Sequence, residues 1–249
     1  MREDKYEFEV GEKGQEGLDI LDVMFNANTK QHILAAGIRP GMHVLDIGCG
    51  RGAMSVWLAE QVGNKGSVIA IDNNENQNKA TIELMKSKSL SWLKFRVLSA
   101  YDINKLTESF DLAYCRFILH HINNPTKVIE QVFQILPKGG IFIAEEGIVS
   151  AAFSYPKVKA WGGERTDHRF PLEKEGEDRD GNFGMKLLHQ MKQVGFDIQF
   201  AGLYQPLLYT KQQKQLLAGP AREGYKHYAL SHGISDEEWQ IQAKELDDL

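Results

Sequence analysis

The run Met42-His-Val-Leu-Asp-Ile-Gly-Cys-Gly-Arg-Gly52 decides how the rest of the chain is interpreted. Its first half, His43–Ile47, is apolar and β-branched enough to predict a short buried strand. Three glycines then fall within the last five positions, and apolar residues at helical spacing follow over 54–62. Glycines allow a backbone to adopt positive φ and to approach a ligand closely. A strand, a glycine turn and a helix in this order predict the opening of a nucleotide-type α/β fold.

The residue before this turn favours one cofactor class. Gly48, Gly50 and Ala53 satisfy the relaxed dinucleotide spacing G-x-G-x-x-G/A, so a nicotinamide or flavin site stays open. A pyrophosphate on the turn would lie close to the carboxylate of Asp46, which repels it. S-adenosylmethionine (SAM) instead presents a sulfonium and an ammonium group, and its carboxylate can use amides of the turn and the helix start. The charges therefore favour SAM over a dinucleotide, and a turn that binds no ligand is the remaining alternative.

The stretch Val44–Gly52 resembles the first motif of the class I SAM-dependent methyltransferases. Further matches, at Tyr155-Pro156, Asp180–Gly184 and Gln205-Pro206, are similar to a bacterial subgroup of small-molecule methyltransferases. The resemblance implies transfer of a methyl group from SAM to a small-molecule acceptor, with S-adenosylhomocysteine as the product.

Composition narrows the class of protein. The 249 residues are 42% hydrophobic and 25% charged, which is ordinary for a globular chain, and the net charge of −5 provides no basic surface for nucleic acid. The two cysteines, Cys49 and Cys115, fall in predicted core elements and indicate neither a disulfide framework nor a zinc site. No signal peptide or membrane span is visible. We therefore expect a cytoplasmic protein with no membrane or nucleic-acid partner.

A helical pattern precedes the first strand and ends near Gly37. The resemblance implies that such a segment packs over the cofactor side of the sheet as a lid, and a helix that merely covers the sheet is the alternative. We expect one methyltransferase domain over 1–249. Its parts are a helical lid (1–37), a cofactor-binding core (38–146), an acceptor-recognition insertion (147–184) and a C-terminal completion (185–249).

The second predicted strand, Ser67–Ile71, ends in Asp72-Asn73-Asn74. An acidic residue at this place accepts hydrogen bonds from ribose hydroxyls in both dinucleotide and SAM sites. An Asp that caps the next helix is the alternative. The position predicts that Asp72, with Asn73 beside it, contacts an adenosine-containing cofactor.

The third predicted strand, 94–98, leads into Ser99, Ala100 and Tyr101. The resemblance implies an Asp here that holds the adenine amino group, and this chain has Ser99 in its place. We expect the Ser99 hydroxyl to accept one hydrogen bond, the Ala100 amide to meet a ring nitrogen and Tyr101 to flank the adenine.

The fourth predicted strand, 110–115, leads into Arg116 and the pair His120-His121. This run also resembles the methyltransferase pattern beside the transferred methyl group. Arg116 is expected to face the cofactor or the substrate. Adjacent residues on a helix point about 100° apart, so the two histidines are not expected to form one catalytic pair. The candidate catalytic residues are His121, which occupies the commoner family position, Arg116, and His168 in the insertion.

Strands and helices alternate up to a fifth strand at 141–146. This order predicts an α/β fold with a doubly wound, mainly parallel, Rossmann-like sheet, preceded by a helical segment and carrying a cap insertion after strand five. In such a sheet the carboxyl ends of the strands meet at one crevice. The residues expected there are Gly48, Asp72, Ser99, Arg116 and Glu145.

The second half of the chain is less regular. The insertion 147–184 carries aromatic residues with an interspersed His and Arg, which suit the recognition of an organic acceptor. The alternative is a surface loop whose aromatic residues only anchor it to the protein. A helix at 185–195 and a sixth strand over 196–208 are expected. No final antiparallel strand of the family type is found, so we expect six strands. A last helix begins after Ser235, with Glu238 completing a capping box.

Three functions follow from these patterns. The first is a SAM-dependent methyltransferase that acts mainly by proximity and orientation, because SAM is already an activated donor. The second is an NAD(P)-dependent oxidoreductase. The third is a non-catalytic module that binds SAM or a partner.

Overall fold

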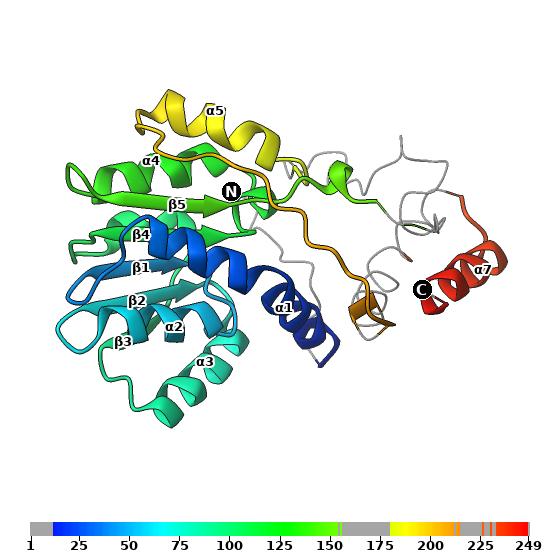
Figure 1. Cartoon of the computed structure of the whole chain (residues 1–249), viewed down its shortest axis with the longest axis horizontal. Helices are drawn as coiled ribbons and strands as arrows, with labels where there is room; N and C mark the ends of the chain where they lie inside the picture. The colour runs from blue at the N-terminus through cyan, green and yellow to red at the C-terminus, as the bar shows by residue number, and fades with distance from the viewer. Residues whose placement is uncertain are drawn as a thin grey trace.

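The computed structural model describes residues 12–153, 155, 180–211, 213–214, 226, 230 and 233–248. Figure 1 shows a central sheet whose strands lie side by side, with helices packed along it. The elements in chain order are α1 (Glu12–Ala35), β1 (His43–Ile47), α2 (Ala53–Val62), β2 (Ser67–Asp72), α3 (Glu75–Lys88), β3 (Leu93–Val97), the 3-10 helix η1 (Ala100–Lys105), β4 (Leu112–Arg116), the 3-10 helix η2 (Leu119–His121), α4 (Pro125–Ile135), β5 (Ile141–Glu145), the 3-10 helix η3 (Val149–Ala151), α5 (Gly184–Val194) and α7 (Asp236–Asp247).

The sheet has the strand order β3-β2-β1-β4-β5, and every pair is parallel. The predicted doubly wound α/β fold is therefore confirmed, and the expected strand boundaries hold to within one or two residues. The direction of winding reverses between β1 and β4. In open parallel sheets this switch point is where a crevice forms beyond the carboxyl ends of the strands.

Each face of the sheet carries its own apolar core. Successive residues of a strand point to opposite faces, so Val44 packs with Leu58 of α2 in one cluster, while the next residue, Leu45, packs with Val132 of α4 in the other. Ile33 of α1 joins the α2 side. Burying an aliphatic side chain of this size contributes about 1.5–3 kcal/mol. The two cores therefore hold the sheet rigidly and fix the carboxyl ends of its strands.

The expected sixth strand is wrong: the described part of the chain contains five strands, and segment 196–209 pairs with none of them. Phe196 packs under α5 against the core, and the chain then runs past α1 (orange in Figure 1). Two ring contacts with α1 hold the segment there, Phe200 with His32 at 5.1 Å and Tyr204 with Phe25 at 6.0 Å between centroids. The apolar residues that suggest a strand thus anchor an extended segment on a helix instead of in the sheet.

The helical predictions hold where they can be compared. The N-terminal segment forms the single helix α1, and α5 ends at Gly195 in the left-handed conformation with φ of 116°. The capping box of Ser235 and Glu238 is present at the start of α7. The helical stretch expected after Leu216 lies mostly outside the described residues. No helix in the described ranges is long and apolar enough to cross a membrane.

Candidate active site

A pocket opens beyond the carboxyl ends of β1, β2 and β4, at the switch point of the sheet. It contains every residue that the sequence assigns to the cofactor: Asp46, Gly48, Cys49, Gly50, Asp72, Asn73, Ser99, Ala100, Tyr101 and Arg116. The candidate catalytic residue His121 also lines it. The structure therefore brings these residues together, and what each one binds stays a prediction.

The glycine turn is held by its own backbone. The amides of Gly48 and Cys49 donate to the carbonyl of Ile71 at 2.8 and 3.0 Å, and the amide of Gly50 donates to Asp72 Oδ2 at 3.0 Å. These three amides are thus directed at the end of β2, which differs from the expectation that the turn offers them to a ligand. The turn is a preformed wall of the pocket.

Gly48 is required by both space and conformation. Its φ of 70° lies in the left-handed region, and a Cβ at this position would meet Ile118 Cδ1 at 2.0 Å. Gly50 also has a positive φ, of 51°, but a Cβ there would have no atom within 4 Å. The two glycines therefore serve different purposes. Gly48 makes room for Ile118 in the turn after β4, and Gly50 only completes the glycine turn.

Asp46 is a buried carboxylate at the base of the pocket. It is 2% exposed and accepts a hydrogen bond from Ser55 Oγ at 2.5 Å. Burial raises the pKa of Asp46 to about 6, and the hydrogen bond from Ser55 and the charge of Arg116 only partly oppose this. Within the described residues Asp46 forms no ion pair. A cationic ligand beside it would stabilise its ionised form.

Asp72 has both structural and binding capacity. Its Oδ2 accepts from Gly50 N, and its Oδ1 accepts from Asn74 N at 2.9 Å. Burial raises the pKa of Asp72, and the backbone hydrogen bonds oppose this rise. Each carboxylate oxygen has two lone pairs, so the bonds to the turn leave acceptor sites on the pocket side. The bracing role and the predicted ribose role are therefore compatible.

The side of the pocket expected to hold adenine is fixed by α4. Tyr101 OH accepts from Asn124 N at 2.9 Å, and Gln131 Nε2 donates to Tyr101 O at 2.7 Å. The Ser99 hydroxyl accepts from Tyr101 N at 3.2 Å and so caps η1. Asp102 does not line the pocket and instead pairs with Lys105 at 3.0 Å.

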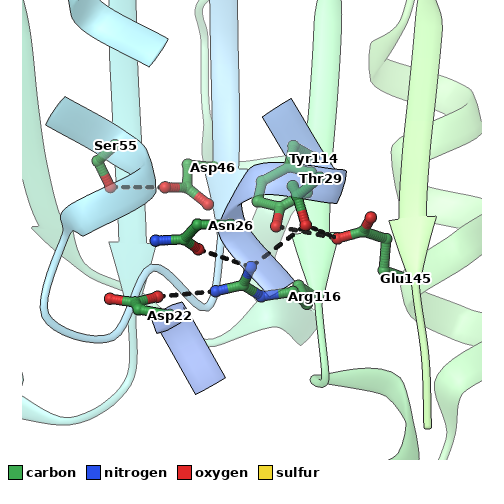
Figure 2. A network of polar contacts seen from close by, with 8 residues as sticks. All are labelled: Asp22, Asn26, Thr29, Asp46, Ser55, Tyr114, Arg116 and Glu145. Carbon is green, nitrogen blue, oxygen red and sulfur yellow. Dashed lines mark hydrogen bonds and ion pairs between the residues drawn. The ribbon is translucent and has the colours of Figure 1, made fainter. Parts of the chain in front are cut away.

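Arg116 joins the end of β4 to α1, as Figure 2 shows. Its Nη2 pairs with Asp22 Oδ1 at 2.9 Å, and its Nη1 donates to Asn26 Oδ1 at 2.8 Å and to Thr29 Oγ1 at 3.3 Å. Only 11% of the Arg116 side chain is exposed. Leu21 and Asp22 also line the pocket, so α1 supplies one of its walls. Asp22 is the polar residue that interrupts the apolar pattern of this helix.

Glu145 lies elsewhere than expected. Its Oε2 accepts from Thr29 Oγ1 at 2.6 Å and from Tyr114 OH at 3.4 Å, and the side chain is not among those lining the pocket (Figure 2). The prediction that Glu145 lines the crevice is therefore wrong. The reason is that the hydroxyl of Thr29, on α1, donates to this carboxylate.

The turn after β4 contains residues that sequence reasoning missed. Phe117 lines the pocket with a φ of 56°, which is uncommon for a bulky side chain, and its ring packs edge-on against Phe25 of α1 at 4.9 Å. Strained backbone of this kind clusters at functional sites. The only signal in the sequence is the position of Phe117 directly after a buried strand.

The two histidines lie closer together than expected. Their ring centroids are 3.9 Å apart, so the prediction that the side chains diverge is wrong. Both residues lie in the three-residue 3-10 turn η2, and their side-chain conformations bring the rings together. His120 is buried and packed, whereas His121 faces the pocket. His168, the third catalytic candidate, lies outside the described residues.

The two described ends of the insertion 147–184 meet beside these histidines. Gly184 N donates to Gly147 O at 3.0 Å, and Ser150 N donates to Asn182 Oδ1 at 2.9 Å. Asp180 N donates to His120 O at 3.3 Å. The insertion therefore starts and ends next to the β4 side of the pocket.

Residues 38–176 match the family model described as a methyltransferase domain, which is more than half of the chain. The chain belongs to this methyltransferase family. The resemblance to class I SAM-dependent methyltransferases is thereby confirmed, and with it SAM as the cofactor of the class. Asp46 fits this cofactor, because a buried carboxylate without an ion-pair partner in the described chain suits a ligand that carries an ammonium and a sulfonium.

Curated methyltransferases match about half of the chain. The ubiquinone/menaquinone biosynthesis C-methyltransferase UbiE of Hydrogenovibrio crunogenus is 27% identical over 124 residues, which is 49% of each chain. The demethylmenaquinone methyltransferase of Alkalihalophilus pseudofirmus is 27% identical over 109 residues, covering 44% of this chain and 46% of that protein. The chain thus matches about half the length of these relatives.

Two solved methyltransferase-like structures cover most of the chain. The candidate sarcosine dimethylglycine methyltransferase of Galdieria sulphuraria has a TM-score of 0.57 at 15% identity, covering 90% of this chain and 78% of that one. The [4+2]-cyclase SpnF has a TM-score of 0.53 at 18% identity, covering 90% and 76%. They show the fold alone, and the cyclase shows that this fold also occurs in a protein named for another reaction.

Proposed function

We propose that the methyltransferase transfers the methyl group of SAM to a small-molecule acceptor, mainly by proximity and orientation. The observation that carries the proposal is the buried carboxylate of Asp46 beside the glycine turn, at the switch point of the sheet. SAM supplies an activated methyl group when it is bound. The residues of the chain then have to hold the acceptor in line and exclude water, which lowers such a barrier by about 7–11 kcal/mol.

Each part of the pocket receives a role in this proposal. Asp46 attracts the cationic end of the cofactor, Asp72 and Asn73 hold the ribose, and the stretch 99–101 holds the adenine. The acceptor then approaches from the β4 side, where Arg116 and His121 line the pocket. His168 is proposed to reach the acceptor from the insertion.

The acceptor class is proposed from the relatives and from the insertion. The matched proteins are named for quinone precursors, which are hydroxyaromatic when reduced. The described ends of 147–184 lie beside His120 and His121, which supports a role of this insertion in acceptor recognition. Segment 1–37 is proposed as the lid, 38–146 as the cofactor-binding core and 185–249 as the C-terminal completion. A cytoplasmic location without nucleic-acid or membrane partners completes the proposal.

A non-catalytic or non-methylating module is the second candidate, because a [4+2]-cyclase shares the fold. Membership of the methyltransferase family makes the NAD(P)-dependent oxidoreductase the weakest of the three hypotheses. Cofactor binding separates the oxidoreductase from the others, and turnover separates the methyltransferase from the module.

The experiment has two stages. S-adenosylhomocysteine and NAD(P) are titrated calorimetrically into the 249-residue chain. Reduced demethylmenaquinone and a panel of phenols are then incubated with SAM that carries a labelled methyl group. Binding of S-adenosylhomocysteine together with label in the acceptor is the expected result. Binding without labelled product would favour the module, and binding of NAD(P) alone would overturn the proposal.

A further inference from the structure

The buried histidine behind the pocket wall has the environment of a proton acceptor. His120 follows β4 in η2, and 9% of its side chain is exposed. Its Nδ1 lies 2.5 Å from Oε2 of Glu146, the residue directly after β5. The Glu146 side chain is fully buried, with 0% exposure. The carboxyl ends of two neighbouring strands therefore bring a carboxylate and an imidazole together.

The contacts of Glu146 fix where the proton of His120 resides. Its Oε1 accepts from the amides of Ile118 and Leu119 at 3.0 and 2.8 Å, and its Oε2 accepts from His120 N at 3.3 Å as well as facing Nδ1. A carboxylate accepts hydrogen bonds and donates none. Nδ1 must therefore carry the hydrogen, and the neutral ring has its lone pair on Nε2.

The Nε2 atom of His120 can accept a proton. Within the described residues His120 makes no hydrogen bond through Nε2. The ring of His120 lies 3.9 Å from the ring of His121 and 6.0 Å from that of Phe117, measured between centroids. Both of these neighbours line the pocket. The two ends of the insertion also reach His120: a Cβ on Gly147 would lie 4.0 Å from Cε1 of the ring, and Asp180 N donates to the His120 carbonyl.

We propose that His120, oriented by Glu146, is the base that removes a proton from the acceptor. The inference rests on the proposed methyl transfer and moves the role of base from His121 to its neighbour. The acceptor atom uses its electron pair to bond the methyl carbon, and the carbon–sulfur bond breaks with its electrons passing to sulfur. The acceptor proton passes to Nε2 of His120, and the resulting imidazolium is stabilised by the carboxylate of Glu146.

The proposal names the chemical class of the acceptor. A base is needed only when the nucleophile is protonated at the working pH. His120 therefore indicates an acceptor with a weakly acidic hydroxyl group, such as a phenol or an enol, whose anion reacts through oxygen or through an adjacent carbon. A tertiary amine or a thioether would have no proton for His120 to take.

The tautomer of the His120 ring can be measured without any acceptor, and it tests whether Glu146 orients this ring. Two-bond proton–nitrogen NMR spectra of the ¹⁵N-labelled chain at pH 7.5 should show His120 with hydrogen on Nδ1 and none on Nε2. The Glu146→Gln variant should lose this preference, because the amide oxygen no longer imposes one tautomer. A wild-type ring that is protonated on Nε2, either as the other tautomer or as imidazolium, would overturn the proposal.

Turnover tests the chemistry. His120→Asn should reduce kcat for reduced demethylmenaquinone about 10²–10⁴-fold, while S-adenosylhomocysteine affinity stays within threefold. Glu146→Gln should cause a smaller loss of kcat. His189→Asn, an exposed histidine of α5, is the matched control and should leave kcat unchanged. A folded His120→Asn variant that binds S-adenosylhomocysteine and retains kcat within threefold would refute the assignment.

The pH profile separates a base from a merely structural residue. Activity of His120→Asn should recover at high pH, where the acceptor ionises without help, and a packing defect would show no recovery. The titratable groups packed against His120 in the described chain are Glu146, His121 and Asp180, the last of which pairs with Lys186 at 2.6 Å. If the wild type itself transferred no methyl group, the proposed function would fail. If the wild type and His120→Asn were equally active, only the role of His120 would fail.

Discussion

The two sides of the pocket are built in different ways. The β1–β2 side is held by backbone bonds, from the amides of Gly48 and Cys49 to Ile71 and from Gly50 to Asp72. The β4 side is held by side chains from α1, with Arg116 bonded to residues 87–94 positions earlier in the chain. The first side is rigid by virtue of a local motif. The second depends on the docking of α1, which contacts between segments distant in the sequence hold in place.

The largest expected effect comes from a substitution in the glycine turn, on the β1–β2 side of the pocket. Gly48→Ala should destabilise the fold by about 3 kcal/mol, because left-handed backbone and a clash with Ile118 act together. Gly50→Ala is the matched control and should cost about 1–2 kcal/mol, since only the backbone conformation opposes it. Urea unfolding measures both. Equal losses at the two positions would show that the contact with Ile118 is unimportant.

The second effect concerns cofactor affinity on the same side. Asp72→Ala should weaken S-adenosylhomocysteine binding by one or two charge-assisted hydrogen bonds, about 1.5–3 kcal/mol each. Asp102→Ala, in η1 and outside the pocket, serves as the control. Calorimetric titration provides the affinities. An unchanged affinity for Asp72→Ala would remove this residue from the ribose role.

The third prediction concerns Asp46, whose ionised form should favour cofactor binding but lower the stability of the ligand-free protein. Because the folded-state pKa of about 6 exceeds the ordinary value of 3.8, the folded protein holds this proton more tightly, and the stability contribution falls as pH rises from about 4 to 6. Asp46→Asn should therefore stabilise the ligand-free protein at pH 7.5, on the order of 1–3 kcal/mol. The wild type should bind S-adenosylhomocysteine more weakly as pH falls below about 6, where protonated Asp46 no longer attracts the ammonium.

Two measurements check this prediction. Denaturant unfolding of Asp46→Asn and the wild type at pH 7.5 and 5 should give a difference that shrinks at the lower pH. Titrations of S-adenosylhomocysteine at the same pH values should show a pH-dependent affinity for the wild type and a weak, nearly constant one for Asp46→Asn. If Asp46→Asn bound S-adenosylhomocysteine as tightly as the wild type, the carboxylate of Asp46 would not attract the ammonium group of the ligand, and the charge argument for SAM would fail.

The smallest expected effect concerns the β4 side of the pocket, which is held by side chains from α1. Asp22→Asn removes one charge from the partly exposed pair with Arg116, and such pairs contribute about 0.2–1 kcal/mol. We expect little change in global stability, but faster hydrogen exchange in α1 and a severalfold faster release of S-adenosylhomocysteine. Stopped-flow displacement measures the release. If exchange quickened equally in β1, the two sides of the pocket would be one cooperative unit.

The same contrast explains what the sequence could predict. The doubly wound parallel sheet and the residues around Gly48, Asp72 and Ser99 follow from local patterns, because alternation and glycine spacing act over a few residues. Glu145 and Glu146 are adjacent and chemically alike, yet one bonds Thr29 of α1 and the other holds His120. Only the placement of segments distant in the sequence separates them, and no local pattern encodes that.

The segment 196–209 failed as a strand for a related reason. Its apolar residues satisfy the strand pattern, but the pattern does not specify the partner, and Phe200 and Tyr204 find theirs on α1. Local periodicity thus predicted extended backbone correctly and sheet membership wrongly. The histidine pair shows the same limit, since the side-chain conformations that bring the two rings together are not specified by backbone periodicity.

The ion pair between Asp22 and Arg116 has a consequence for the order in which the pocket is completed during translation. The two residues are 94 positions apart, so at elongation rates of about 5–20 residues per second α1 waits roughly 5–20 s before its partner on β4 has been synthesised. During translation the nascent chain therefore completes β1, α2 and β2, and with them the glycine turn, well before the wall formed by α1 can dock. The residues assigned to ribose are therefore synthesised before Arg116, and the wall formed by α1 can be completed only after β4 has been translated.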